Sequence, residues 1–207
     1  MHDPSIVKTL LFTDIEGSTR LWAQEPERMR HALARHDALL RAAVESNRGA
    51  IVKTTGDGIY ATFDDPLGGL HATLSIQRAL ADPAATSDIP LRVRCALHVG
   101  VVEHRDGDYF GTAVNQAARI MSAAHGGQAL VSKSAADLLA DRLPAGVALR
   151  DLGSIRLRDL VGATHVDGDP VVVHVHIDGH RPPVGPDRHS ISAAPVTLAR
   201  PDPDRLA

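Results

Sequence analysis

The chain has 207 residues, a formal net charge of -3 and one cysteine, Cys95. This length suffices for one domain with a sizeable core, and the mild charge gives no support for binding to nucleic acid or a membrane surface. One cysteine excludes an internal disulfide framework and suits a reducing compartment. No run approaches the ~18 apolar residues of a membrane span, and the N-terminus lacks the basic region of a signal peptide. The composition therefore predicts a soluble, cytoplasmic protein.

The first third of the chain predicts a strand, a long helix and a hairpin. Residues 6–12 are apolar and β-branched, as in a buried strand. Helical spacing follows over residues 20–47, where Pro26 separates a short first turn from the main helix. Residues 50–63 predict two strands joined by a tight turn at the "GDG" of residues 56–58.

The rest of the chain alternates between helical and strand patterns. In chain order we predict a helix at 66–82, a loop at 83–90, a strand at 91–104, a turn at 105–108, a helix at 109–125, a strand at 128–132, a helix at 134–143, a paired strand region at 147–160 and a last strand at 171–177. Residues 178–207 are rich in proline and lack periodicity, which predicts a disordered tail. The whole pattern favours an α+β fold, a sheet with helices mainly on one face.

Asp14 stands at the carboxyl end of the first predicted strand, a place where sheets often carry functional groups. Gly17, Ser18 and Thr19 follow, and their backbone N–H groups could face an anion at the start of the helix. On its own the segment fits equally well a strand end followed by a side-chain helix cap. Both interpretations stay open at this point.

A second aspartate, Asp57, lies in the predicted hairpin turn between Gly56 and Gly58. On this segment alone a plain Asp-Gly turn is favoured. If the hairpin lies beside the first strand, however, Asp14 and Asp57 share one site. Two carboxylates with open oxygen positions suit Mg²⁺ or Mn²⁺ ions that also hold phosphates.

Three segments carry a resemblance to a known family: "LLFTDIEGSTRLW" at residues 10–22, the "TTGDG" hairpin within 49–63, and "GDYFGTAVNQAARI" at 107–120. Together and in this order they resemble the class III nucleotidyl cyclases, which make cyclic AMP or cyclic GMP. The short stretch between Val102 and Asp108 resembles the bacterial subclass with an abbreviated dimer arm. The resemblance implies a single catalytic domain over residues 1–177 with a ferredoxin-like βαββαβ core, followed by the tail.

The resemblance also implies a metal site. Asp14 and Asp57 match the family's metal-binding aspartates and would hold two divalent ions, Mg²⁺ or Mn²⁺, with the backbone carbonyl of Ile15 as a further ligand. One ion would lower the pKa of the ribose 3′-hydroxyl, and the other would screen the leaving pyrophosphate. Glu16 is assigned no ligand role.

Other matching residues would bind the triphosphate and the base. The turn through Gly17, Ser18 and Thr19 would meet the β- and γ-phosphates, and Arg158, where the family often has lysine, would neutralise the triphosphate. Lys53 and Asp108 match the pair that reads the base. A lysine can donate to adenine N1 while an aspartate accepts from the N6 amino group, so the pair favours ATP over GTP.

Asn115 and Arg119 lie four residues apart on a predicted helix, so their side chains share a face. By resemblance, Asn115 would hold the ribose and Arg119 would stabilise charge on the α-phosphoryl group in the transition state. In this family the metal aspartates come from one subunit and the other two pairs from its partner. A head-to-tail homodimer with two equivalent sites, and an inactive monomer, is therefore expected.

Two alternatives remain: a guanylyl or relaxed-specificity cyclase, and a dimeric nucleotide-binding regulatory module with weak turnover. All six key family positions are filled, which argues against the second. The "GGDEF" signature of diguanylate cyclases and the Walker A sequence of P-loop NTPases are missing. His174 and His176 share a face of the last predicted strand, but an ordinary exposed face is favoured there over a histidine metal site.

Overall fold

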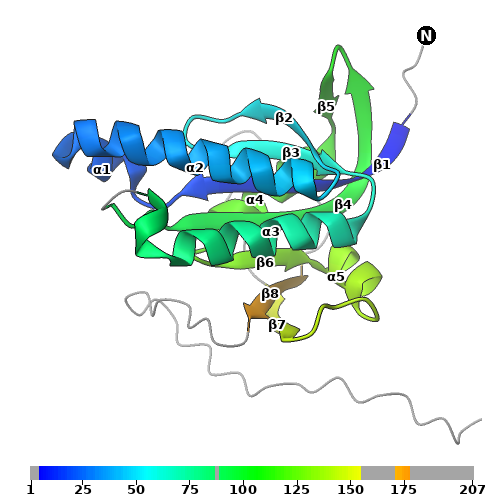
Figure 1. Cartoon of the computed structure of the whole chain (residues 1–207). Helices are drawn as coiled ribbons and strands as arrows, with labels where there is room; N and C mark the ends of the chain where they lie inside the picture. The colour runs from blue at the N-terminus through cyan, green and yellow to red at the C-terminus, as the bar shows by residue number, and fades with distance from the viewer. Residues whose placement is uncertain (1–4, 87–88, 155–170, 178–207) are drawn as a thin grey trace, which may run out of the picture.

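The computed structural model describes residues 5–86, 89–154 and 171–177. Its elements, in chain order, are β1 (Ser5–Ile15), α1 (Ser18–Gln24), α2 (Pro26–Ser46), β2 (Ala50–Thr54), β3 (Ile59–Phe63), α3 (Pro66–Ala81), the short 3₁₀ helix η1 (Pro83–Thr86), β4 (Val93–Arg105), β5 (Asp108–Phe110), α4 (Thr112–Ala123), β6 (Ala129–Ser132), α5 (Lys133–Leu139), β7 (Val147–Ser154) and β8 (Val171–Ile177). Figure 1 shows these elements arranged around one sheet. No helix of the described residues is long and apolar enough to cross a bilayer.

The described strands form a single sheet in the order β2-β3-β1-β4-β6-β8-β7, with β5 paired to β4 at one end. The central strand β1 is antiparallel to both β3 and β4, whereas β4 runs parallel to β6. The chain passes through α2 between β1 and β2, and through α3 between β3 and β4. This is the βαββαβ arrangement of a ferredoxin-like core, so the predicted fold class is confirmed.

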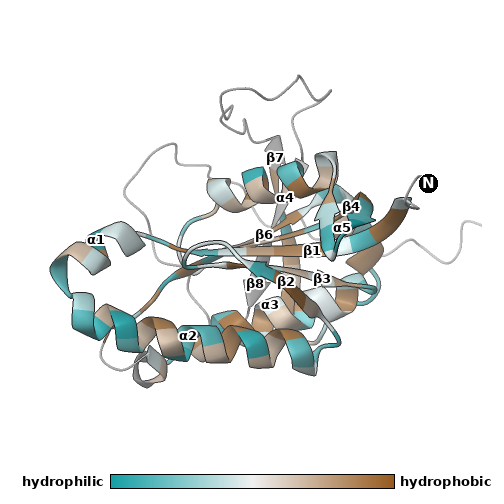
Figure 2. Cartoon of the chain, turned by 90° about the horizontal axis from the view of Figure 1, so that it is seen from above, coloured by the Kyte–Doolittle hydropathy of each residue, from teal (hydrophilic) through white to brown (hydrophobic). Residues whose placement is uncertain are grey.

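The two faces of the sheet are covered by different helices (Figure 2). Successive side chains of a strand point to opposite faces. Leu11 and Ile15 of β1 accordingly pack with buried residues of α2, α3 and α5, while Leu10 and Phe12 pack with Ala113 and Ala117 of α4. Helices therefore lie mainly on one face, as predicted, and α4 covers the other.

The predicted division of the first helical region at Pro26 is confirmed. Pro26 occupies the first turn of α2, where a missing backbone N–H costs nothing, and Glu27 adds a favourable negative charge there. The next helix on the same face, α3, is capped by Asp65, whose carboxylate accepts a hydrogen bond from the Leu67 amide at 3.1 Å. Both long helices thus start at residues that suit a helix N-terminus.

The structure corrects three boundaries. The first strand continues to Ile15, so Asp14 lies inside β1, where it pairs with β4. The helix predicted from residue 109 begins only at Thr112, because residues 108–110 pair with β4 as the short strand β5. The helix predicted at 134–143 ends at Leu139. The end of the strand region predicted at 147–160 and the predicted tail at 178–207 lie outside the described residues.

Candidate active site

Several predicted site residues lie on the face of the sheet that carries α4. Residues directly opposite each other in antiparallel strands share a face. Asp14 of β1 is opposite Arg94 of β4. Phe12, two residues before Asp14 on β1, is opposite Tyr60 of β3. Tyr60 is in turn opposite Lys53 of β2, next to a local irregularity of the ladder. The register therefore places Asp14 and Lys53 on one face, in adjacent rows.

The hairpin that carries Asp57 is held tightly against the end of β1. The backbone N–H of Ile59 donates to the Thr13 hydroxyl at 3.0 Å, in the buried interior. A Cβ atom on Gly58 would lie only 1.9 Å from the carbonyl oxygen of Thr13, so only glycine allows this approach. The turn is thus fixed next to the residue before Asp14, and Asp57 is brought to the side of Asp14.

The two carboxylates interact directly. Burial raises the pKa of Asp14, the ion pair with Arg94 counteracts this, and the neighbouring Asp57 carboxyl group raises it further. Oδ2 of Asp57 is buried without a hydrogen-bond partner among the described residues. Among the residues that the structure describes, no group of three or more His, Cys, Asp or Glu side chains could by itself hold a metal ion. An unpartnered carboxylate oxygen beside a second carboxylate fits a divalent ion that takes its other ligands from phosphates and water.

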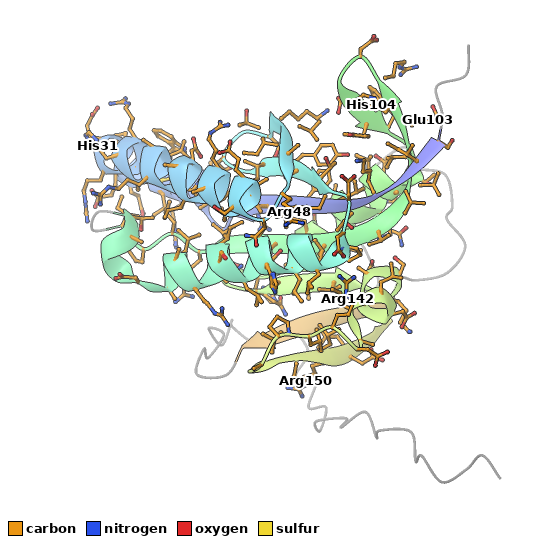
Figure 3. All side chains as sticks on the ribbon, turned by 45° about the vertical axis from the view of Figure 1, so that its right-hand side comes forward. His31, Arg48, Glu103, His104, Arg142 and Arg150 are labelled. Carbon is orange, nitrogen blue, oxygen red and sulfur yellow. The ribbon has the colours of Figure 1, made fainter. Side chains whose placement is uncertain are left out.

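Lys53 and Asp108 form an ion pair within one chain. Lys53 Nζ lies 2.5 Å from Asp108 Oδ2, and the backbone N–H of Tyr109 donates to Asp108 Oδ1 at 2.8 Å. The hydrogen bond from Lys53 makes the largest contribution to lowering the pKa of Asp108, and the hydrogen bond from Tyr109 lowers this pKa further. Asp108 lies on the β4–β5 hairpin, which projects at one end of the sheet near the labelled Glu103 and His104 (Figure 3).

Asn115 and Arg119 share the side of α4 that faces away from the core. The buried side of this helix consists of Ala113, Ala117 and Ile120. Asn115 is exposed and Arg119 is half-buried. No hydrogen bond or ion pair joins either side chain to another described residue, so both polar groups are available to a ligand or a partner.

Comparison with known proteins agrees with this geometry. The adenylate and guanylate cyclase catalytic domain family matches residues 4–169. The chain belongs to the class III nucleotidyl cyclases. An uncharacterised protein of Mycobacterium tuberculosis is 38% identical over 159 residues, which cover 76% of this chain and 53% of the relative. A receptor-type adenylate cyclase of Trypanosoma brucei brucei is 30% identical over 72% of this chain and 16% of its own length.

A solved structure shares the fold as well. An adenylate cyclase from Trypanosoma brucei, described in its monomeric state, superposes with a TM-score of 0.69 at 26% identity, covering 84% of this chain and 92% of that one. The cyclase chain spans about half the length of its M. tuberculosis relative and a smaller part of the trypanosomal receptor. The match therefore concerns the catalytic domain.

Other predicted site residues of the cyclase domain surround the start of α1. Gly17 adopts a left-handed conformation with a φ of 72°, and no side chain caps α1, so the alternative of a side-chain helix cap in this segment is wrong. Ile15 is buried at the end of β1. The carboxylate of Glu16 accepts a hydrogen bond from the Gly126 amide at 3.0 Å, which gives Glu16 a structural partner. Arg158 lies outside the described residues.

Sequence reasoning missed Arg94. Its guanidinium forms an ion pair with Asp14, and its Nε is buried without a partner among the described residues. An arginine with a free buried donor beside a pair of carboxylates is suited to an anion such as phosphate. The signal was an arginine between the apolar Val93 and Cys95 of the predicted strand, but only the pairing of β1 with β4 places it against Asp14.

Within one chain the site residues form separate groups. Asp14, Asp57 and Arg94 form one group, Lys53 and Asp108 a second, and the exposed side of α4 a third. Among the described residues no hydrogen bond or ion pair connects one group with another.

Proposed function

We propose that this cyclase domain converts ATP to 3′,5′-cyclic AMP and pyrophosphate, at sites shared across a head-to-tail homodimer. The observation that carries the proposal is the contact between Asp14 and Asp57, in which Asp57 Oδ2 is buried without a partner among the described residues. Two such carboxylates suit divalent ions that bind a triphosphate. The adenylate cyclase activity named for the trypanosomal relatives supports the same reaction.

Asp14, Asp57 and the carbonyl of Ile15 would hold two divalent ions, Mg²⁺ or Mn²⁺. Bound there, the ions supply positive charge that favours ionisation of the ribose 3′-hydroxyl and offsets charge on the leaving pyrophosphate. The raised pKa of Asp14 supports this assignment, because a buried carboxylate next to a second carboxylate is most readily ionised when a cation takes the place of the proton.

Lys53 and Asp108 would read the nucleobase. A lysine ammonium donates to adenine N1, and an ionised aspartate accepts from the N6 amino group. The lowered pKa of Asp108 keeps it in the acceptor form that this requires. Guanine presents a protonated N1 and a carbonyl oxygen instead, so both contacts would be mismatched.

Asn115 and Arg119 would act on the ribose and the α-phosphate. Asn115 orients the ribose, so that the 3′-oxygen lies in line with the bond to be broken. The 3′-hydroxyl loses its proton to water, its oxygen forms a bond to the α-phosphorus, and the bond from the α-phosphorus to the bridging oxygen breaks, so that pyrophosphate leaves. Arg119 donates to the α-phosphoryl oxygens as their charge changes.

The triphosphate would meet the turn formed by Gly17, Ser18 and Thr19, together with Arg94 and Arg158. Arg94 already lies against Asp14 and has an unpartnered buried Nε within the described structure. Because arginine binds phosphate through two parallel N–H groups, Arg94 would hold a phosphate group directly beside the metal site.

We also assign this domain to the cytoplasm, since the single thiol of Cys95 suits a reducing compartment.

The separation of the groups within one chain supports the proposed dimer. Lys53 and Asp57 lie in the same hairpin, yet among the described residues no hydrogen bond or ion pair joins the metal group to Asn115 or Arg119. If each site takes its metal carboxylates from one subunit and the base-reading and ribose-holding pairs from the other, one chain serves two sites.

The test is product formation from ATP and from GTP, each with Mg²⁺ and with Mn²⁺, by the purified chain and by Asp14→Ala. We expect cyclic AMP from ATP, a loss of at least about 10²-fold in Asp14→Ala, and an unchanged dimer by sedimentation. Asp64→Ala, which removes an exposed carboxylate, is the control. Cyclic GMP from GTP would favour a guanylyl or relaxed-specificity cyclase. Nucleotide binding without any product would favour a regulatory module.

A further inference from the structure

Tyr60 is a buried polar residue to which the proposed mechanism assigns no role. It is fully buried in the layer between the sheet and α4, and its ring stacks on Phe12 with centroids 4.4 Å apart and an angle of 18°. Its hydroxyl is buried with no hydrogen-bond partner among the described residues. A buried hydroxyl without a partner destabilises a fold, so such a group calls for an explanation.

The residue itself lies close to the base-reading pair. Tyr60 is opposite Lys53 in the β2–β3 ladder, and Lys53 Nζ lies 5.9 Å from the centre of its ring. Burial raises the pKa of Tyr60, and the charges of Asp108 and Tyr109 raise it further. The phenol therefore remains a hydrogen-bond donor, within electrostatic range of the Asp108 carboxylate.

One carboxylate oxygen of Asp108 accepts its hydrogen bond from Lys53. Its Oδ1 accepts from the backbone N–H of Tyr109, whereas its Oδ2 accepts from Lys53 Nζ. If Lys53 turns toward a nucleobase, Oδ2 loses this donor. An aspartate that has lost its cationic partner is a weaker and less well-oriented acceptor.

We propose that Tyr60 is a positioning residue of the base-reading pair, whose hydroxyl donates to Asp108 Oδ2 when Lys53 engages the nucleobase. The inference rests on the proposed function. The hydrogen bond keeps the carboxylate ionised and directed at the exocyclic amino group of adenine. This hydrogen bond would give a role to a buried hydroxyl that has no partner among the described residues, and it would contribute to discrimination between ATP and GTP.

The experiment compares Tyr60→Phe with Thr62→Val. Both remove one buried hydroxyl from β3 on the same face of the sheet, but Thr62 is not next to Lys53 in the ladder. For each variant we would measure the melting temperature, kcat and KM with ATP and GTP, and the Kd of the α,β-methylene analogues of both nucleotides. The analogues cannot be cyclised, so binding is read independently of turnover.

For Tyr60→Phe we expect a KM and an analogue Kd for the adenine nucleotide about tenfold higher than in the wild type. We also expect an unchanged kcat, an unchanged guanine affinity, and a melting temperature equal to or above that of the wild type. A lower melting temperature with unchanged discrimination would show a purely structural hydroxyl and overturn the inference. A similar loss of adenine affinity in Thr62→Val would also overturn the inference, because the effect would then not be specific to Tyr60.

Failure of the proposed function gives a different pattern. A wild-type chain that binds the adenine analogue but forms no cyclic product refutes the catalytic proposal, while the analogue Kd of Tyr60→Phe still decides the role of Tyr60. A wild-type chain that binds neither analogue overturns both.

Discussion

Lys53 Nζ lies 2.5 Å from Asp108 Oδ2 in a single chain, although 55 residues separate them in sequence. Lys53 comes from β2, and Asp108 from the β4–β5 hairpin that folds back toward the α4 face, where Tyr109 packs beside Phe12 and Tyr60. Both residues of the proposed base-reading pair therefore come from the same subunit. Base preference would be a property of one subunit, which can be altered by changing that subunit alone.

Reversing the polarity of this pair should change base preference. We expect Lys53→Ala to lower kcat/KM for ATP by about 10- to 1,000-fold. The double variant Lys53→Glu with Asp108→Cys should use GTP better than ATP, since a carboxylate can accept from guanine N1. Steady-state assays with both nucleotides measure this. Lys8→Ala, which breaks an ion pair between Lys8 and Asp64 outside the site, should leave the preference unchanged. An unaltered ATP:GTP ratio in the double variant would contradict the assignment.

Two inactive variants should complement each other. In a heterodimer of Asp57→Ala and Arg119→Ala, one site collects both damaged residues and the other collects neither. Mixing the two proteins should restore up to about one intact site per heterodimer, whereas each variant alone should have at least about 10²-fold less activity than the wild type. Native mass spectrometry would verify heterodimer formation. Verified heterodimers that stay inactive would exclude a shared site.

Gly58 should tolerate no side chain. A Cβ atom there would overlap the Thr13 carbonyl oxygen, so we expect Gly58→Ala to lower the free energy of unfolding by about 1–3 kcal/mol and to abolish metal-dependent turnover. Gly56→Asn is the matched control, because Gly56 has open space around it at a φ of +74° and asparagine tolerates that conformation. Denaturant unfolding and cyclase assays test both. Full activity in Gly58→Ala would show that the hairpin need not pack against β1.

Acid should destabilise the fold through His98. This side chain is buried on β4, and burial lowers its pKa from 6.5 to about 4. Below pH 6.5 the unfolded chain takes up a proton that the folded chain refuses until about pH 4. Stability should therefore fall over this window by about 3 kcal/mol.

Denaturant unfolding between pH 7.5 and 4 measures this loss. His98→Leu, which cannot titrate, should show a smaller loss over the same range. His31→Leu changes an exposed histidine of α2 (Figure 3) and should follow the wild type. Equal pH dependence in the wild type and His98→Leu would show that another group is responsible.

Local patterns in the sequence were sufficient for most of the fold and for the candidate residues. Apolar periodicity, Pro26 and the "GDG" turn predicted the main elements, because each signal acts over a few neighbouring residues. Motif resemblance picked out Asp14, Asp57, Lys53, Asp108, Asn115 and Arg119. Their roles in binding and catalysis stay predictions, as do those of Ser18, Thr19 and Arg158.

The tertiary structure decided what depends on strand register and close approach. Pairing of β1 with β3 and β4 places Asp57 and Arg94 against Asp14, and pairing of β4 with residues 108–110 turns a predicted helical start into β5. Pairing of β2 with β3 places the buried Tyr60 opposite Lys53. These contacts join residues far apart in the chain, and a local pattern contains no information about which distant strand lies beside it. The sequence by itself determined the elements and the chemical groups, whereas only long-range packing decided which of those groups meet.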